Sequence, residues 1–191
     1  MIKIKQNSKA FTMVETLVSV CLFGFISVVL INVFIASINS QTRILQNQEL
    51  MDQSTYALEY MAKSVRMAQK DVDGFCTGTI NANYTVSTNS ITFLAYDTKE
   101  AAYRCRQFFL GSGIIKEMRS TTASADDFAA AQDITSSKVA VTDLTFAVTG
   151  NVVGDTVQPK VTMMIEMVSG TASSSPTITI QTSVSKRELD I

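Results

Sequence analysis

The sequence predicts an α+β protein: one long N-terminal helix followed by an antiparallel β-sheet that packs on the second half of that helix. Three observations support this class. A mostly apolar run without charge extends from Thr16 to Thr42, helical periodicity continues beyond it, and the rest is rich in Thr, Ser, Val and Ile. At 191 residues, the chain has room for one ordinary domain and a membrane segment.

Residues 11–40 are predicted to form a transmembrane helix, because about 20 apolar residues suffice to cross a bilayer. Lys3, Lys5 and Lys9 precede the run. By the positive-inside rule, the N-terminus then stays in the cytoplasm and everything after about Ser40 is exported. A cleaved secretory signal is the alternative. The length of the run and the lack of a clean cleavage site after it favour a retained, single-pass anchor in the cytoplasmic membrane.

One carboxylate, Glu15, lies at the start of the apolar run. A charge costs about 2–3 kcal/mol at the centre of a spanning helix and less at its edge. Glu15 therefore either reaches for lipid headgroups or has a specific positive partner.

The segment Lys9-Ala10 followed by "FTMVETLVSV" resembles the leader and first mature residues of type IV pilins and type II secretion pseudopilins. The resemblance implies that residues 1–10 are a leader cut between Ala10 and Phe11. Phe11 would become the N-methylated terminus and Glu15 the fifth mature residue. Ala10 departs from the Gly that is usual before the cut.

The resemblance also implies partners: other pilin or pseudopilin subunits, a prepilin peptidase and methyltransferase, and an assembly platform in the inner membrane. Glu15 of an incoming subunit would pair with the Phe11 amine of its neighbour, since each charge is costly alone near lipid. Such pairing would set the stagger between adjacent helices.

Residues 41–73 are predicted to continue the helix as an amphipathic segment. Its buried stripe is expected to include Ile44, Met51, Leu58 and Val65, which recur at intervals of seven. The helix is expected to end near Lys70, with Gly74 as its stop.

Residues 74–191 are predicted to form an exported β-rich domain. Alternation and composition predict five strands and a single sheet that covers the helix stripe. This layout is similar to the pilin fold of minor pilins and pseudopilins of the W or J type. The expected strands are 90–96, 103–110, 138–148, 160–168 and 177–184.

Of the three cysteines, Cys76 and Cys105 fall in this domain and Cys21 in the apolar run. In an oxidising compartment, Cys76 and Cys105 are a candidate disulfide, and Cys105 is expected to face the core. The alternative is two unrelated thiols, since no metal-type spacing links them.

The composition argues against an enzyme. Histidine is absent, and Lys plus Arg (16) nearly balance Asp plus Glu (17), so neither His-based catalysis nor a general attraction to nucleic acid is expected. We expect no cofactor and no metal: "DVDG" at 71–74 and "SADDF" at 124–128 lack the spacing of a calcium loop. A basic region with aromatics between is expected to be a solvated strand face rather than a nucleic-acid site; it comprises Tyr103, Arg104, Arg106, Phe108, Phe109, Lys116 and Arg119.

Two functions follow as hypotheses. The first is a structural filament subunit assembled through its processed N-terminal helix. The second is a membrane-anchored exported binding protein, in which the helix is only a tether for a β-rich ligand domain. A mature chain that begins at Phe11 would distinguish the first from the second.

Overall fold

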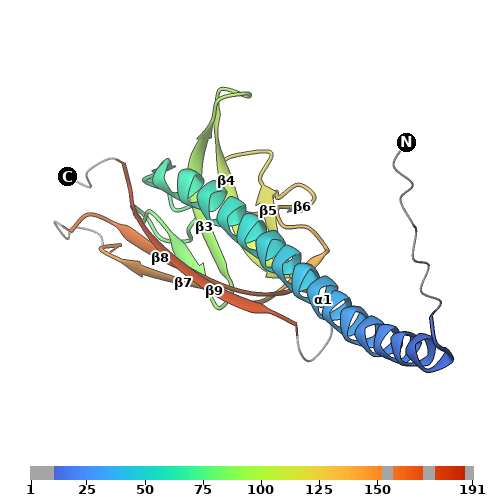
Figure 1. The fold of residues 1–191 in the computed structure, drawn as a ribbon. Coiled ribbons are helices and arrows are strands. Elements are labelled where there is room, and N and C mark those ends of the chain that lie inside the picture. The colour runs from blue at the N-terminus through green and yellow to red at the C-terminus, as the bar shows by residue number, and fades with distance from the viewer. Residues whose placement is uncertain (1–10, 152–156, 170–174, 188–191) are drawn as a thin grey trace, which may run out of the picture. The chain divides into compact units, whose positions relative to one another are not determined.

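We describe the protein from a computed structural model, which covers residues 11–151, 157–169 and 175–187. The described residues form one helix and nine strands, an α+β architecture as predicted (Figure 1). The elements are α1 (Met13–Arg66), β1 (Ala68–Gln69), β2 (Thr85–Ser87), β3 (Ser90–Asp97), β4 (Ala102–Gly111), β5 (Ile114–Arg119), β6 (Gln132–Asp133), β7 (Val139–Thr149), β8 (Lys160–Ser169) and β9 (Thr177–Ser185).

The chain divides into two compact units, Met1–Ile44 and Leu45–Ile191. The described part of the first unit holds the apolar portion of α1. The second unit holds the rest of α1 and all the described strands.

The strands of the second unit lie in two antiparallel sheets rather than the single sheet that we predicted. One sheet has the order β1-β3-β4-β5-β6, with β2 also paired to β3, and the other has the order β7-β8-β9. The five predicted strands are confirmed as β3, β4, β7, β8 and β9. The other four strands are not predicted, because β1, β2 and β6 are short and β5 lacks the expected alternation of apolar and polar residues.

The core of the second unit joins one face of α1 to both sheets. From the helix it takes Leu50, Ala57, Leu58, Met61 and Val65. The alternating residues of β8 supply a second row, in which Val161, Met163, Ile165 and Met167 are all buried. Burying such side chains contributes about 1.5–3 kcal/mol each.

The predicted helix stripe is right in its second half and wrong in its first. Leu58 and Val65 are buried, but Ile44 and Met51 are 52% and 50% exposed. A straight helix drifts about 20° per seven residues, so the row that begins at Ile44 and Met51 starts outside the buried face and reaches it only at Leu58. The buried face instead follows steps of three and four through Leu50, Ser54, Ala57, Met61 and Ser64.

The helix ends at Arg66, not near Lys70 as predicted, because the next residues join a sheet. Ala68 and Gln69 pair with Ala95 and Leu94 of β3. Gly74 has φ +73° in the following loop, and an added Cβ there would lie 3.0 Å from Ile80 N. The close approach, rather than a helix stop, therefore explains this glycine.

Candidate functional site

The sequence-predicted site lies at the start of α1. Phe11 is exposed and precedes the helix, while Ala10 and the rest of the predicted leader lie outside the described residues. The Thr12 hydroxyl accepts a hydrogen bond from Glu15 N (3.3 Å), so Thr12 caps the helix. Glu15 lies in the first turn, where the helix dipole favours a carboxylate.

The apolar part of α1 makes no core within its own chain. None of residues 11–49 is buried, although large apolar side chains such as Phe23, Phe25 and Phe34 line this segment. Of the described helices, α1 is long and apolar enough to cross a membrane, and its most apolar window is entirely unburied. This segment is a candidate membrane span.

Polar side chains within the apolar segment bond back to their own helix. The hydroxyls of Ser19 and Ser27 donate to the carbonyls of Glu15 (2.7 Å) and Phe23 (2.8 Å). The Asn32 amide donates to Val28 O at 3.0 Å. These donors are thereby satisfied without water, as an apolar surrounding requires.

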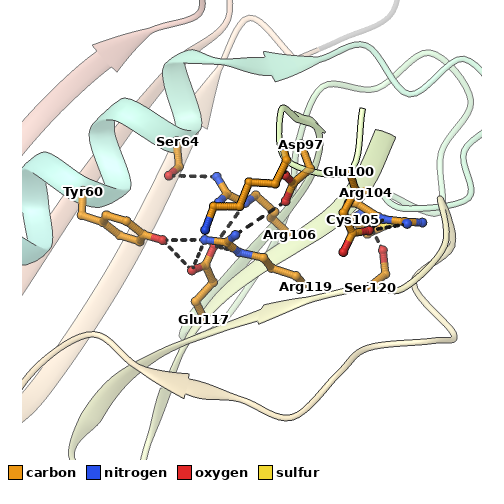
Figure 2. Close-up of polar contacts among 11 residues, drawn as sticks. Tyr60, Ser64, Asp97, Glu100, Arg104, Cys105, Arg106, Glu117, Arg119 and Ser120 are labelled. Atoms are coloured by element: carbon orange, nitrogen blue, oxygen red, sulfur yellow. Dashed lines mark hydrogen bonds and ion pairs between the residues drawn. The ribbon is translucent and has the colours of Figure 1, made fainter. Parts of the chain in front are cut away.

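A buried ionic network, not predicted from the sequence, fastens the second half of α1 to the sheet (Figure 2). Its centre is Glu117 of β5, which is 3% exposed. The Tyr60 hydroxyl of α1 donates to Glu117 Oε2 at 2.6 Å. Arg106 Nε lies 3.1 Å from Glu117 Oε1, and Arg119 donates to both carboxylate oxygens at 3.0 and 3.1 Å.

Further contacts extend the network to the helix and to β3. Arg106 Nη1 donates to the Ser64 hydroxyl (3.2 Å), and Arg119 Nη2 donates to Tyr60 Oη (2.9 Å). Arg119 Nη1 also lies 3.6 Å from Asp97 Oδ2. The polar groups of the network bond to one another, and they come from both the helix and the sheet. The network therefore acts as a clamp between α1 and the sheet that contains β4 and β5.

Three members of the network have pKa values shifted from their ordinary ones. Burial raises the pKa of Tyr60, with the adjacent Glu117 adding to the effect. The hydrogen bonds to Glu117 raise the pKa of Arg119. The backbone N–H of Lys99, which bonds to Asp97, lowers the pKa of that carboxyl.

The basic region anticipated from the sequence is not a single solvated face. Arg106 and Arg119 belong to the buried network, and Phe108 is fully buried against Tyr60, with ring centroids 6.0 Å apart. Lys116 pairs with Asp133 at 2.8 Å. Alternate residues of β4 and β5 thus point to opposite sides of the sheet.

Cys76 and Cys105 are joined by a disulfide, with Cα atoms 5.4 Å apart. Cys105 is fully buried, but on the face of β4 opposite to Arg106 and Phe108, which contact the helix. Cys105 is therefore buried, as expected, but it lies outside the hydrophobic cluster that α1 joins. Cys105 is covered instead by the loop that carries Cys76.

Asp71 organises that loop. Its Oδ1 accepts from Gly74 N (3.0 Å), and its Oδ2 accepts from Cys76 N and Thr77 N (2.8 Å each) and from the Thr77 hydroxyl (3.0 Å). The carboxylate is thus committed to backbone donors that hold Cys76 in place. Among the described residues, no group of three or more His, Cys, Asp or Glu could hold a metal.

The disulfide predicts a simple result from intact-mass measurement. The chain should gain two hydrogens on reduction, since the sulfurs of Cys76 and Cys105 take up one each. The Cys105→Ser variant should show no such gain and should lose about 3–4 kcal/mol of unfolding free energy on the chain-entropy model. An unchanged mass for the unsubstituted chain would contradict the bond.

A second prediction concerns alkaline stability. Tyr84 is 1% exposed and donates to Val65 O at 2.9 Å, and burial raises its pKa above the ordinary 10.0. The folded chain therefore keeps the hydroxyl proton of Tyr84 to a higher pH than the unfolded chain does. The stabilisation is complete below about pH 10 and is lost as pH rises through the folded pKa.

In Tyr84→Phe this alkaline loss should disappear, at a cost of about 1 kcal/mol at neutral pH for the missing hydrogen bond. Urea unfolding should show a smaller difference in unfolding free energy between the two chains at pH 11 than at pH 7. Tyr56→Phe, at a residue that is 58% exposed, is the control. The same difference in unfolding free energy at both pH values would contradict the prediction.

Comparisons of this chain with protein-family models, with curated proteins and with solved structures find no match.

Proposed function

We propose that the chain is a structural subunit, a minor pilin or pseudopilin, of a type IV pilus or type II secretion-like filament. The observation that carries the proposal is the pairing of two features at one end of α1. The first is an apolar helical surface with no buried residue between 11 and 49, and the second is a carboxylate in its first turn, at Glu15. Such a surface needs lipid or other helices around it.

In the proposed assembly, a peptidase on the cytoplasmic side removes residues 1–10 and Phe11 becomes a methylated amine. Before assembly, the chain is anchored in the cytoplasmic membrane with its C-terminal domain exported. On incorporation, Glu15 pairs with the Phe11 amine of a neighbouring subunit, and the apolar face of α1 passes from lipid to helix–helix contact. The disulfide suits an oxidising compartment outside the cytoplasm.

The test is mass spectrometry of the N-terminus of membrane-extracted protein. The expected mature chain begins at Phe11 and carries one methyl group. Ala10→Gly, which restores the residue usual in the resembled family, should be processed at least as completely. A chain that retains Met1, or begins after the apolar run, would overturn the proposal and favour a tethered binding domain.

A further inference from the structure

Among the residues that the structure describes, no strand lies along the outer edge of β9. β9 pairs with β8 from Thr177 to Ser185 and is the last strand of its sheet. Among the described residues, the backbone of β9 bonds only to β8, and its outward side chains are exposed at every second position. An open edge presents unpaired N–H and C=O groups that can pair with another strand.

The long strands at the other sheet edges in the described structure are paired with short strands or interrupted by a register shift. β5 is paired with β6, and Arg119 O and Ile115 O accept from Ala129 N and Ile134 N. β3 is flanked by both β1 and β2. β7 has a register shift between Val141 and Asp143, and Val141 N donates to Gly113 O at 2.8 Å.

β9 also lacks the features that protect natural edges. Its sequence, "TITIQTSVS", contains no charged residue and no proline, and its pairing with β8 shows no register shift. Edge strands usually carry Lys, proline or a bulge to prevent pairing with other chains. The openness of this edge therefore calls for an occupant.

The sequence of β9 is complementary to itself in the antiparallel sense. If Gln181 lies opposite Gln181 of a second copy, the pairs on its exposed face are Thr179 with Ser183 and Thr177 with Ser185, all hydroxyls. On the opposite face, Ile178 meets Val184 and Ile180 meets Thr182. All four side chains are β-branched, and all but the buried Val184 are partly exposed. No like charges face one another.

We infer that β9 is a self-pairing edge, by which two copies of this chain form an antiparallel two-fold contact centred on Gln181. The two three-stranded sheets would then continue into one six-stranded sheet. The exposed face of β9 already makes a hydroxyl pair of the required kind, between Thr162 and Ser183 at 2.8 Å. The contact is isologous, so it closes as a dimer.

This inference goes beyond the proposed filament role and does not rest on it, because the contact uses neither Glu15 nor leader cleavage. It would join two subunits in the membrane before assembly, or subunits of two adjacent filaments. The two-fold contact itself can be tested with the unprocessed full chain in the membrane.

The register can be tested by oxidative cross-linking of the full chain in membranes, in a Cys21→Ser background. Residues directly opposite in an antiparallel pair have Cα atoms about 4.5–5.5 Å apart, within disulfide reach. Gln181→Cys should therefore give a dimer on a non-reducing gel. Expressed alone, Ser183→Cys and Thr179→Cys should each give at least tenfold less cross-linked dimer than Gln181→Cys does. When the two are co-expressed, they should cross-link to each other.

Charge substitution supplies an independent test of the same register. Gln181→Lys and Gln181→Glu should each abolish the dimer, because like charges then lie opposite, and co-expression of the two should restore it. Equal cross-linking at all three positions, no dimer with Gln181→Cys, or a Gln181→Lys chain that still dimerises would overturn the inference. Retention of the Cys76–Cys105 disulfide in each variant verifies that the domain has folded.

Discussion

Glu15→Ala is expected to abolish incorporation of the chain into filaments while leaving it inserted in the membrane. Under the proposed function, the variant leaves the Phe11 amine of a neighbouring subunit without its partner in an apolar surrounding. Removing one member of a buried ion pair costs about 3–5 kcal/mol, which corresponds to a loss of roughly a hundredfold or more per contact. The measurement compares the chain in sheared filaments with the chain in the membrane fraction.

Two control variants separate this role from local effects on the helix. Thr12→Ala removes the cap that bonds to Glu15 N, at a cost of about 1 kcal/mol, but keeps the carboxylate. Glu49→Ala removes another carboxylate of α1, which lies 3.9 Å from Lys138 in an exposed pair. Both variants should still assemble.

Glu15→Asp supplies a further comparison, because it keeps the charge on a shorter side chain. It should assemble partially. Normal assembly of Glu15→Ala, or an equal defect in Thr12→Ala, would contradict the role assigned to the Glu15 carboxylate.

The parts of the fold that follow from local pattern could be predicted from the sequence. The apolar segment of α1 is marked by its length and lack of charge. The strands β8 and β9 are marked by alternation, and in β8 the alternating residues are the buried ones. Each of these signals is contained within about ten to twenty neighbouring residues.

The features that depend on distant residues could not be predicted. The end of α1 is set by partners far along the chain: Val65 O accepts from the Tyr84 hydroxyl and Arg66 O accepts from Arg187 N. Neither donor is marked by the sequence around residue 66. The local signal at Gly74 predicts a later end, because a helix usually ends beside its own capping residue.

The buried network escaped prediction for a related reason. β5 places Ile115 and Glu117 on its buried side, so one of its two buried positions carries a charge. Periodicity rules assign charged residues to the solvent face, so they do not predict this strand, and they predict a solvated position for Arg119. Only the three-dimensional meeting of β4, β5 and α1 brings the compensating charges together.

That network leads to the largest expected effect on the folding of the domain. Glu117→Gln should lower the unfolding free energy by about 3–5 kcal/mol, because two guanidinium groups would lose the buried carboxylate that both contact. Tyr60 would lose its charged acceptor as well. The measurement is urea unfolding of the full chain in mild detergent, followed by near-ultraviolet circular dichroism of the tyrosines.

Glu100→Gln is the matched control, because Glu100 also pairs with an arginine in the same sheet. Its carboxylate lies 2.5 Å from Arg104 Nη2, but the Glu100 side chain is 60% exposed against 3% for Glu117 (Figure 2). An exposed pair contributes about 0–1 kcal/mol, so this variant should unfold almost as the unsubstituted chain does. Equal losses in the two variants would mean that burial does not govern these pairs. Losses near zero in both would mean that apolar packing alone holds α1 to β5.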